Sequence, residues 1–284
     1  MTRTAFRFLA IFVYAAVGFA QDPVIDAARR AATAFAKSLP DYVVRRTTQR
    51  YRSSPVLGSS RGAETGCISV PNARGPNNCP PAQAPVAQPA EAWRLLDTVT
   101  ADVVAQGGKE VYLDLLVDGW PTQDPGKNGW WSEGEFSNTL EVILSPNSGG
   151  LFSEPRTTTI ANRAAIRYDY AVEQPNSSWH ISADASGYAP AHGGTIWIDS
   201  ATSGVLRTEM AARELPEKFP LKSVNSTVEY GFVKIGEWSY LLPTHAETII
   251  CPRDSALCSR NVTEFRNYRK YSSESSVRFE GTVK

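Results

Sequence analysis

Alternating apolar and polar positions between residues 195 and 279 predict a meander of antiparallel strands. On its second strand, Leu206, Thr208 and Met210 share one face. Turn residues at 200–204 and at Gly236 separate consecutive strands. The pattern predicts these strands in order: Thr195–Asp199, Val205–Ala212, Ser226–Ile235, Trp238–Ile250 and Cys258–Lys270.

An amphipathic helix and a strand precede this meander. Asp22 is expected to cap the helix, Pro23 to open it, and Pro40 to end it, with apolar residues at helical spacing between them. Tyr42–Tyr51 is rich in β-branched and aromatic residues and is the first expected strand. Its basic residues fall on both faces, which favours solvated positions over an anion site: Arg46 and Arg50 on one face, Arg45 on the other.

The middle of the chain predicts two hairpins and a second helix. Trp93–Val104 and Glu110–Val117 flank a Gly-Gly turn, and the strand Ala164–Val172 is expected to pair with Ser178–Ala183. Between them, Ser132 begins a capping-box pattern that ends at Glu135 and predicts a helix from that point. Four carboxylates of the first hairpin are expected on a wet face: Asp97, Asp102, Asp114 and Asp118. This order of elements, without a βαβ rhythm, predicts an antiparallel α+β fold.

Composition indicates an N-terminal signal peptide and one insertion in a single domain. Residues 1–20 show the basic start, the apolar run and the small residues of a secretory signal peptide cut near Ala20, so we expect a periplasmic or secreted protein. Residues 21–284 are expected to form a single domain, interrupted at 53–89 by a Pro/Ser/Gly-rich insertion. No later stretch is apolar for long enough to predict an integral membrane span.

Charge and cysteine content narrow the function classes. Without the signal peptide, 27 basic residues face 29 acidic ones, a balance that gives no field for nucleic acid. The four cysteines form two close pairs, Cys67 with Cys79 and Cys251 with Cys258. In an oxidising compartment these predict two disulfides, and their spacing fits a zinc site poorly.

Residues that could carry catalysis are scattered. The histidines at 180, 192 and 245 show no ligand spacing, with His192 expected in a loop before two glycines and the other two in strands. The serine-hydrolase spelling at 58–62 lies in the insertion, without the strand and helix that this motif needs. We therefore expect no enzyme, no metal and no cofactor.

Three tryptophans fall in a Gly/Pro-rich loop after the first hairpin. Trp120, Trp130 and Trp131 either pack on the sheet rim or contact a partner protein. The sequence leaves both interpretations open.

Short motifs resemble the bacterial lipoprotein carriers of the Lol system and their sensor relatives. The strand–Asp–turn–Gly–strand pattern at 195–210 is similar to a hairpin of that superfamily. The strand at 42–51 and the segments at 227–230 and 240–243 stand where the superfamily has strands. The end of the chain, Phe265–Tyr271, is similar to uncharacterised exported bacterial members.

The resemblance implies an incomplete β-barrel, a strongly curved antiparallel sheet wrapped around apolar helices. It also implies an apolar hollow between sheet and helices that holds a lipid, an acyl chain or a protein partner. Eight residues are expected to line it: Phe136, Leu140, Leu144, Ile196, Ile198, Leu206, Met210 and Val228. The leading hypothesis is a non-enzymatic binding protein for a lipid or for a lipoprotein acyl chain, and the alternative is an interaction or sensor module of the cell envelope.

Overall fold

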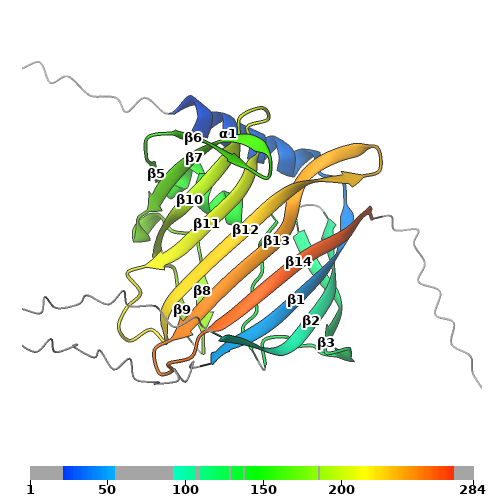
Figure 1. Ribbon diagram of the computed structural model, residues 1–284, viewed down its shortest axis with the longest axis vertical. Helices are drawn as coiled ribbons and strands as arrows, with labels where there is room; N and C mark the ends of the chain where they lie inside the picture. The colour runs from blue at the N-terminus through cyan, green and yellow to red at the C-terminus, as the bar shows by residue number, and fades with distance from the viewer. Residues whose placement is uncertain are drawn as a thin grey trace, which may run out of the picture.

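The computed structural model describes residues 22–54, 92–106, 109–127, 129–136, 138–184 and 186–271. The expected signal peptide, the Cys67 and Cys79 pair and all of the insertion after Ser54 lie outside these ranges. The described part is dominated by one large antiparallel sheet, drawn in Figure 1 as long, twisted diagonal strands. Two α-helices accompany it, so the predicted α+β class with an incomplete barrel is confirmed.

The sheet has twelve strands within the described residues, in the order β4-β3-β2-β1-β14-β13-β12-β11-β10-β7-β5, with β6 also on β7. Strand β1 therefore pairs with β14 in the middle of the sheet, so the first and last strands of the described chain meet there. A separate hairpin joins β8 to β9. The bounds are β1 Tyr42–Ser54, β2 Ala92–Gln106, β3 Lys109–Val117, β4 Trp120–Pro121, β5 Leu151–Phe152, β6 Arg156–Ile160, β7 Arg163–Val172, β8 Ile181–Ala183, β9 Ser186–Tyr188, β10 Ala191–Asp199, β11 Val205–Arg213, β12 Leu221–Ile235, β13 Trp238–Pro252 and β14 Ser259–Lys270.

Helix α1, Pro23–Ser38, lies across one end of the sheet (Figure 1). Asp22 caps it as predicted, because its carboxylate accepts the amide of Val24 at 2.8 Å. The same carboxylate accepts the hydroxyl of Tyr168 at 2.9 Å, which ties the helix start to β7. Ile25 and Ala28 are buried in the main core against the sheet.

Helix α2, Asn138–Leu144, is shorter than predicted. Ser132 and Glu135 precede it instead of capping it, and their side chains bond each other at 2.6 Å. Glu135 is held by Arg46 of β1, so its carboxylate cannot turn back to a helix start. Two short 3-10 helices follow along the chain, Pro146–Ser148 and Gln174–Asn176.

The predicted pairing of Ser178–Ala183 with the preceding strand is wrong. Only Ile181–Ala183 is a strand, and it pairs with β9. The neighbour of β7 is β10, through pairs such as Ile196 with Tyr168. The 3-10 helix at 174–176 takes the chain off the main sheet, so the long partner comes from further along the sequence. A second, smaller core forms where β8 meets Phe219 and Leu221.

Candidate functional site

A cavity of about 430 Å³ opens between α1, α2 and the ends of the central strands. The β10–β11 turn and the β12–β13 hairpin complete its wall. The described residues that line it include no charged side chain. They are Ala31, Ala32, Leu140, Thr202, Gly204, Val205, Tyr230, Phe232, Trp238, Ser239, Tyr240 and Leu241. Such a wall suits an uncharged, apolar ligand.

Small residues keep this space open. Ala31 and Ala32 face it from α1, where longer side chains would occupy it. At the β10–β11 turn, a Cβ on Gly204 would lie 2.6 Å from the Cδ2 of Leu241, so a larger residue there would require the Leu241 side chain to shift. The hydroxyl of Tyr230 donates to the carbonyl of Glu135 at 3.5 Å, which turns its polar end away toward the loop before α2.

The eight residues predicted to bind ligand lie close together, mostly as core. Leu140 lines the cavity. Six others are buried in the main core: Phe136, Leu144, Ile196, Ile198, Met210 and Val228. Leu206 is buried at a register shift, and Val205 takes the position opposite Ile198. Their binding role stays a prediction, while the aromatic wall from β12 and β13 was missed.

The sheet face that packs against the helices, called the inner face here, carries buried ion pairs at its other end. Arg46 and Arg50 were expected in solvent, but only 1% and 2% of their surfaces are exposed. Arg46 donates to Glu135 at 3.1 Å and lies 4.0 Å from the centre of the Trp131 ring. Arg50 binds both carboxylate oxygens of Asp97 at 2.6 Å. Both arginines of β1 are buried because partners from distant segments cover their charges.

Glu110 extends this ionic cluster. Its carboxylate accepts the hydroxyl of Tyr112 at 3.2 Å, and that oxygen accepts Arg46 at 3.4 Å. Burial raises the pKa of Glu110 to about 7, and the negative charge of Glu135 adds to the shift. Glu110 is therefore largely protonated at mildly acidic pH.

The outer face carries exposed or half-exposed ion pairs between neighbouring strands. Arg207 binds Glu209 at 2.7 Å and also contacts Glu229. Asp102 was also expected on a wet face, but only 14% of its side chain is exposed, and it pairs with Arg45 at 2.8 Å. Asp97 departs from that expectation because it faces Arg50 on the inner side. Asp118 accepts the amide of Thr98, and both Asp114 and Asp118 have positive φ angles of 49° in the β3 region.

The three loop tryptophans differ in their surroundings. Trp131 packs edge-on against Tyr112 and covers Arg46. Trp130 packs against the smaller core, and its carbonyl accepts the side-chain amide of Asn261 at 2.9 Å. Trp120 leaves 75% of its surface exposed. A partner contact remains a prediction for the three, and Trp120 is the most exposed of them.

The histidines do not come together. His192 was expected in a loop but lies in β10, fully buried, with Nδ1 3.1 Å from the hydroxyl of Ser177. Burial lowers its pKa, which favours the neutral ring. His180 lies outside the strands and is exposed, contrary to its expected strand position. His245 lies in β13 and contacts Glu264 at 2.8 Å on the outer face.

Cys251 and Cys258 form a disulfide, as predicted, between the ends of β13 and β14. Cys67 and Cys79 are outside the described residues. Within the described ranges, no group of three or more His, Cys, Asp or Glu residues is arranged to hold a metal ion. The helices described there are all too short or too polar to cross a membrane.

Two solved structures are similar to this chain. One is a LolA superfamily protein from Nitrosomonas europaea, at 10% identity and a TM-score of 0.32, covering 87% of this chain and 94% of the other. The second is a DUF1329 family protein from Desulfovibrio piger, at 10% identity and a TM-score of 0.36, covering 90% and 96%. Both likenesses are too distant to transfer a function to this chain. No family model and no curated protein matches the chain.

Proposed function

We propose that this protein is an exported, non-enzymatic binding protein that holds a lipid or acyl chain in the cavity beside α1. The observation that carries the proposal is a space of about 430 Å³ lined without charged side chains. Small-molecule sites fall in the same size range and are mainly apolar. Each methylene transferred from water into such a site contributes about 0.8 kcal/mol, so a chain of several carbons suffices for binding.

Export is part of the proposal. The N-terminal pattern at 1–20 is that of a signal peptide, and the Cys251–Cys258 disulfide fits an oxidising compartment. A periplasmic or secreted protein with an apolar cavity can carry a chain through water, where the free chain is poorly soluble.

The alternative is an interaction module of the envelope. It is favoured by Trp120, whose surface is mostly exposed, and by Val111 and Leu113, two further exposed apolar residues on β3. None of the three lines the cavity. The two functions can therefore be tested with separate variants.

The deciding experiment combines native mass spectrometry of protein purified from its own envelope with titration of a fluorescent fatty acid. We expect a co-purifying lipid or acyl species and saturable probe binding. Ala31→Trp should weaken probe binding at least about tenfold, because the indole fills the cavity. Ala34→Trp on the exposed side of α1 is the matched control and should bind like the unmodified protein. An empty protein that takes up no probe would refute the proposal.

A further inference from the structure

The mouth of the cavity carries two exposed aromatic rings. We name residues 232–241, the turn between β12 and β13 with its flanks, the mouth hairpin. Trp238 leaves 72% of its surface exposed and Phe232 leaves 44%, and both line the cavity. Large apolar rings in water are unfavourable, so two of them at the opening of an apolar cavity point to a binding surface.

The mouth hairpin has a rigid support. Ile235 is buried in the main core, and Val233 and Tyr240 pack against that core. Gly236 makes the turn with a φ of 63°. These anchors fix the backbone of the hairpin, and the rings of Trp238 and Phe232 are left exposed on its two opposite faces. The hairpin projects at the same end of the sheet as α1 (Figure 1).

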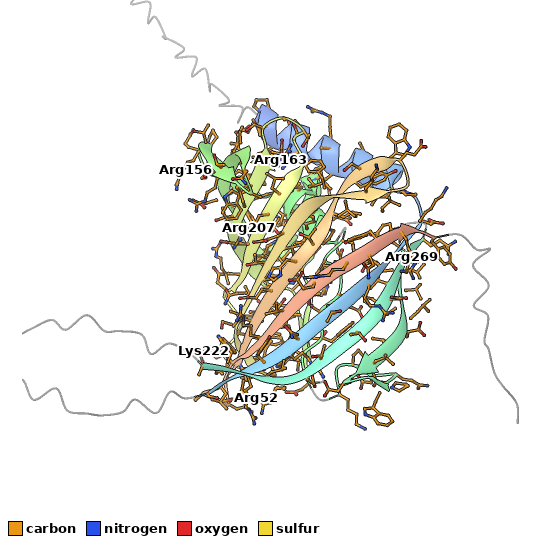
Figure 2. All side chains as sticks on the ribbon, turned by 45° about the vertical axis from the view of Figure 1, so that its right-hand side comes forward. Arg52, Arg156, Arg163, Arg207, Lys222 and Arg269 are labelled. Carbon is orange, nitrogen blue, oxygen red and sulfur yellow. A yellow bond between two sulfur atoms is a disulfide. The ribbon has the colours of Figure 1, made fainter. Side chains whose placement is uncertain are left out.

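Cationic side chains accompany the rings. The guanidinium of Arg163 lies 4.6 Å from the centre of the Phe232 ring, and Figure 2 shows Arg163 at the end of the sheet beside α1. Lys234 is exposed two residues after Phe232, which places it on the same side of the strand. Asp199 holds Arg163 and Glu237 lies in the turn, so the local charge is mixed.

Aromatic rings with nearby Lys or Arg are typical of surfaces that rest at the boundary between lipid head groups and acyl chains. A Trp ring places its apolar body in the acyl region and its N–H among the head groups. Lys234 would meet the phosphates, whereas Arg163 is already paired with Asp199. Glu237 opposes this attraction, so the rings must supply most of the affinity.

We propose that the mouth hairpin docks on a phospholipid bilayer, with Trp238 and Phe232 in the head-group boundary. The proposal rests on the proposed function and names where the ligand passes in or out. In this position the cavity opens toward the acyl chains, and a chain can move between bilayer and protein without crossing water. Docking through two rings is weak and reversible, as a carrier requires.

The test is flotation of the full chain with vesicles made of equal parts phosphatidylcholine and phosphatidylglycerol. We expect the unmodified protein to float with the vesicles. The double variant Phe232→Ser/Trp238→Ser should bind at least about tenfold more weakly, because it loses the burial of two large apolar side chains in the bilayer. The control variant Trp120→Ser removes a Trp side chain that is 75% exposed but lies outside the mouth hairpin, and it should bind like the unmodified protein.

A charge variant sharpens the assignment. Glu237→Lys should strengthen binding to these vesicles, and the gain should disappear with pure phosphatidylcholine. Absence of flotation, equal binding by the double variant, or equal loss in Trp120→Ser would overturn the proposal. So would self-association at the mouth, seen as a mass that rises with concentration only when Phe232 and Trp238 are present.

The cavity variant separates the two proposals. Ala31→Trp should lose the fatty-acid probe yet still float with vesicles, because it leaves the mouth hairpin unchanged. A protein that binds the probe but not vesicles would refute docking and leave the proposed function intact. A protein that floats but takes up no probe would refute the proposed function.

Discussion

The sheet face that packs against the helices is filled differently at its two ends. Beside α1 the chain uses Ala31, Ala32 and Gly204, and it leaves a cavity. At the other end, the same face is covered by Arg46 and Arg50 with their carboxylate partners. Apolar contacts are non-directional and tolerate empty space, whereas a buried charge requires a partner in a fixed place. The apolar end is thus suited to exchange a ligand, and the ionic end to fix the loop at 125–136.

The ionic end gives the largest expected effect. Replacing Arg46 by Leu leaves the buried carboxylate of Glu135 without its guanidinium and uncovers the ring of Trp131. Removing one partner of a buried ion pair costs about 3–5 kcal/mol. We expect urea denaturation to show a loss of unfolding free energy in this range. The binding free energy of the fatty-acid probe at the other end should change far less than the free energy of unfolding.

A matched double variant separates lost charge pairing from lost packing. Arg46→Leu with Glu135→Leu removes both charges, and apolar replacement of a buried pair is often neutral or stabilising. We expect the double variant to recover most of the lost stability. If it is as unstable as the single variant, the stranded charge is not the cause.

Glu110 makes the ionic end sensitive to pH. Its pKa is about 7 in the folded protein, against an ordinary value of 4.5. As pH rises between these values, the unfolded chain loses its proton while the folded protein keeps it, so stability falls. Above pH 7 both forms are ionised and the loss is complete, at about 3 kcal/mol or less. Denaturation of Glu110→Gln should lack this decline, and an equal decline in that variant would assign it to other groups.

Much of the fold was predictable because it follows from local pattern. The cap at Asp22, the strands of the meander and the turn at Gly236 were all confirmed, since apolar alternation and turn residues act over a few positions. The pairing of β1 with β14 joins segments more than two hundred residues apart. No local pattern encodes that pairing, and it was not predicted.

The site was less predictable, for two physical reasons. Alternation showed that Arg46 and Arg50 share a face, but burial depends on carboxylates that arrive from residues 97 and 135. Most of the large residues named from the pattern became core, and the cavity lies between the small residues Ala31 and Ala32 of α1 and the aromatic side chains of β12 and β13. The signal that could have located it is the pair Ala31 and Ala32 on the apolar side of α1, together with the Trp beside the Gly236 turn.

The smallest effect is expected on the outer face, where Arg207 holds two carboxylates in partial contact with water. The partners Glu209 and Glu229 are each 42% exposed in their side chains, so solvent screens both pairs. Exposed pairs contribute about 0–1 kcal/mol, and Arg207→Ala should cost no more than about that amount. Since about 1 M salt shortens the screening length to roughly 3 Å, the cost should shrink there, while the cost of Arg46→Leu should not. Urea denaturation at low and high salt measures both. Equal salt dependence of the two variants would mean that the inner pair is as wet as the outer one.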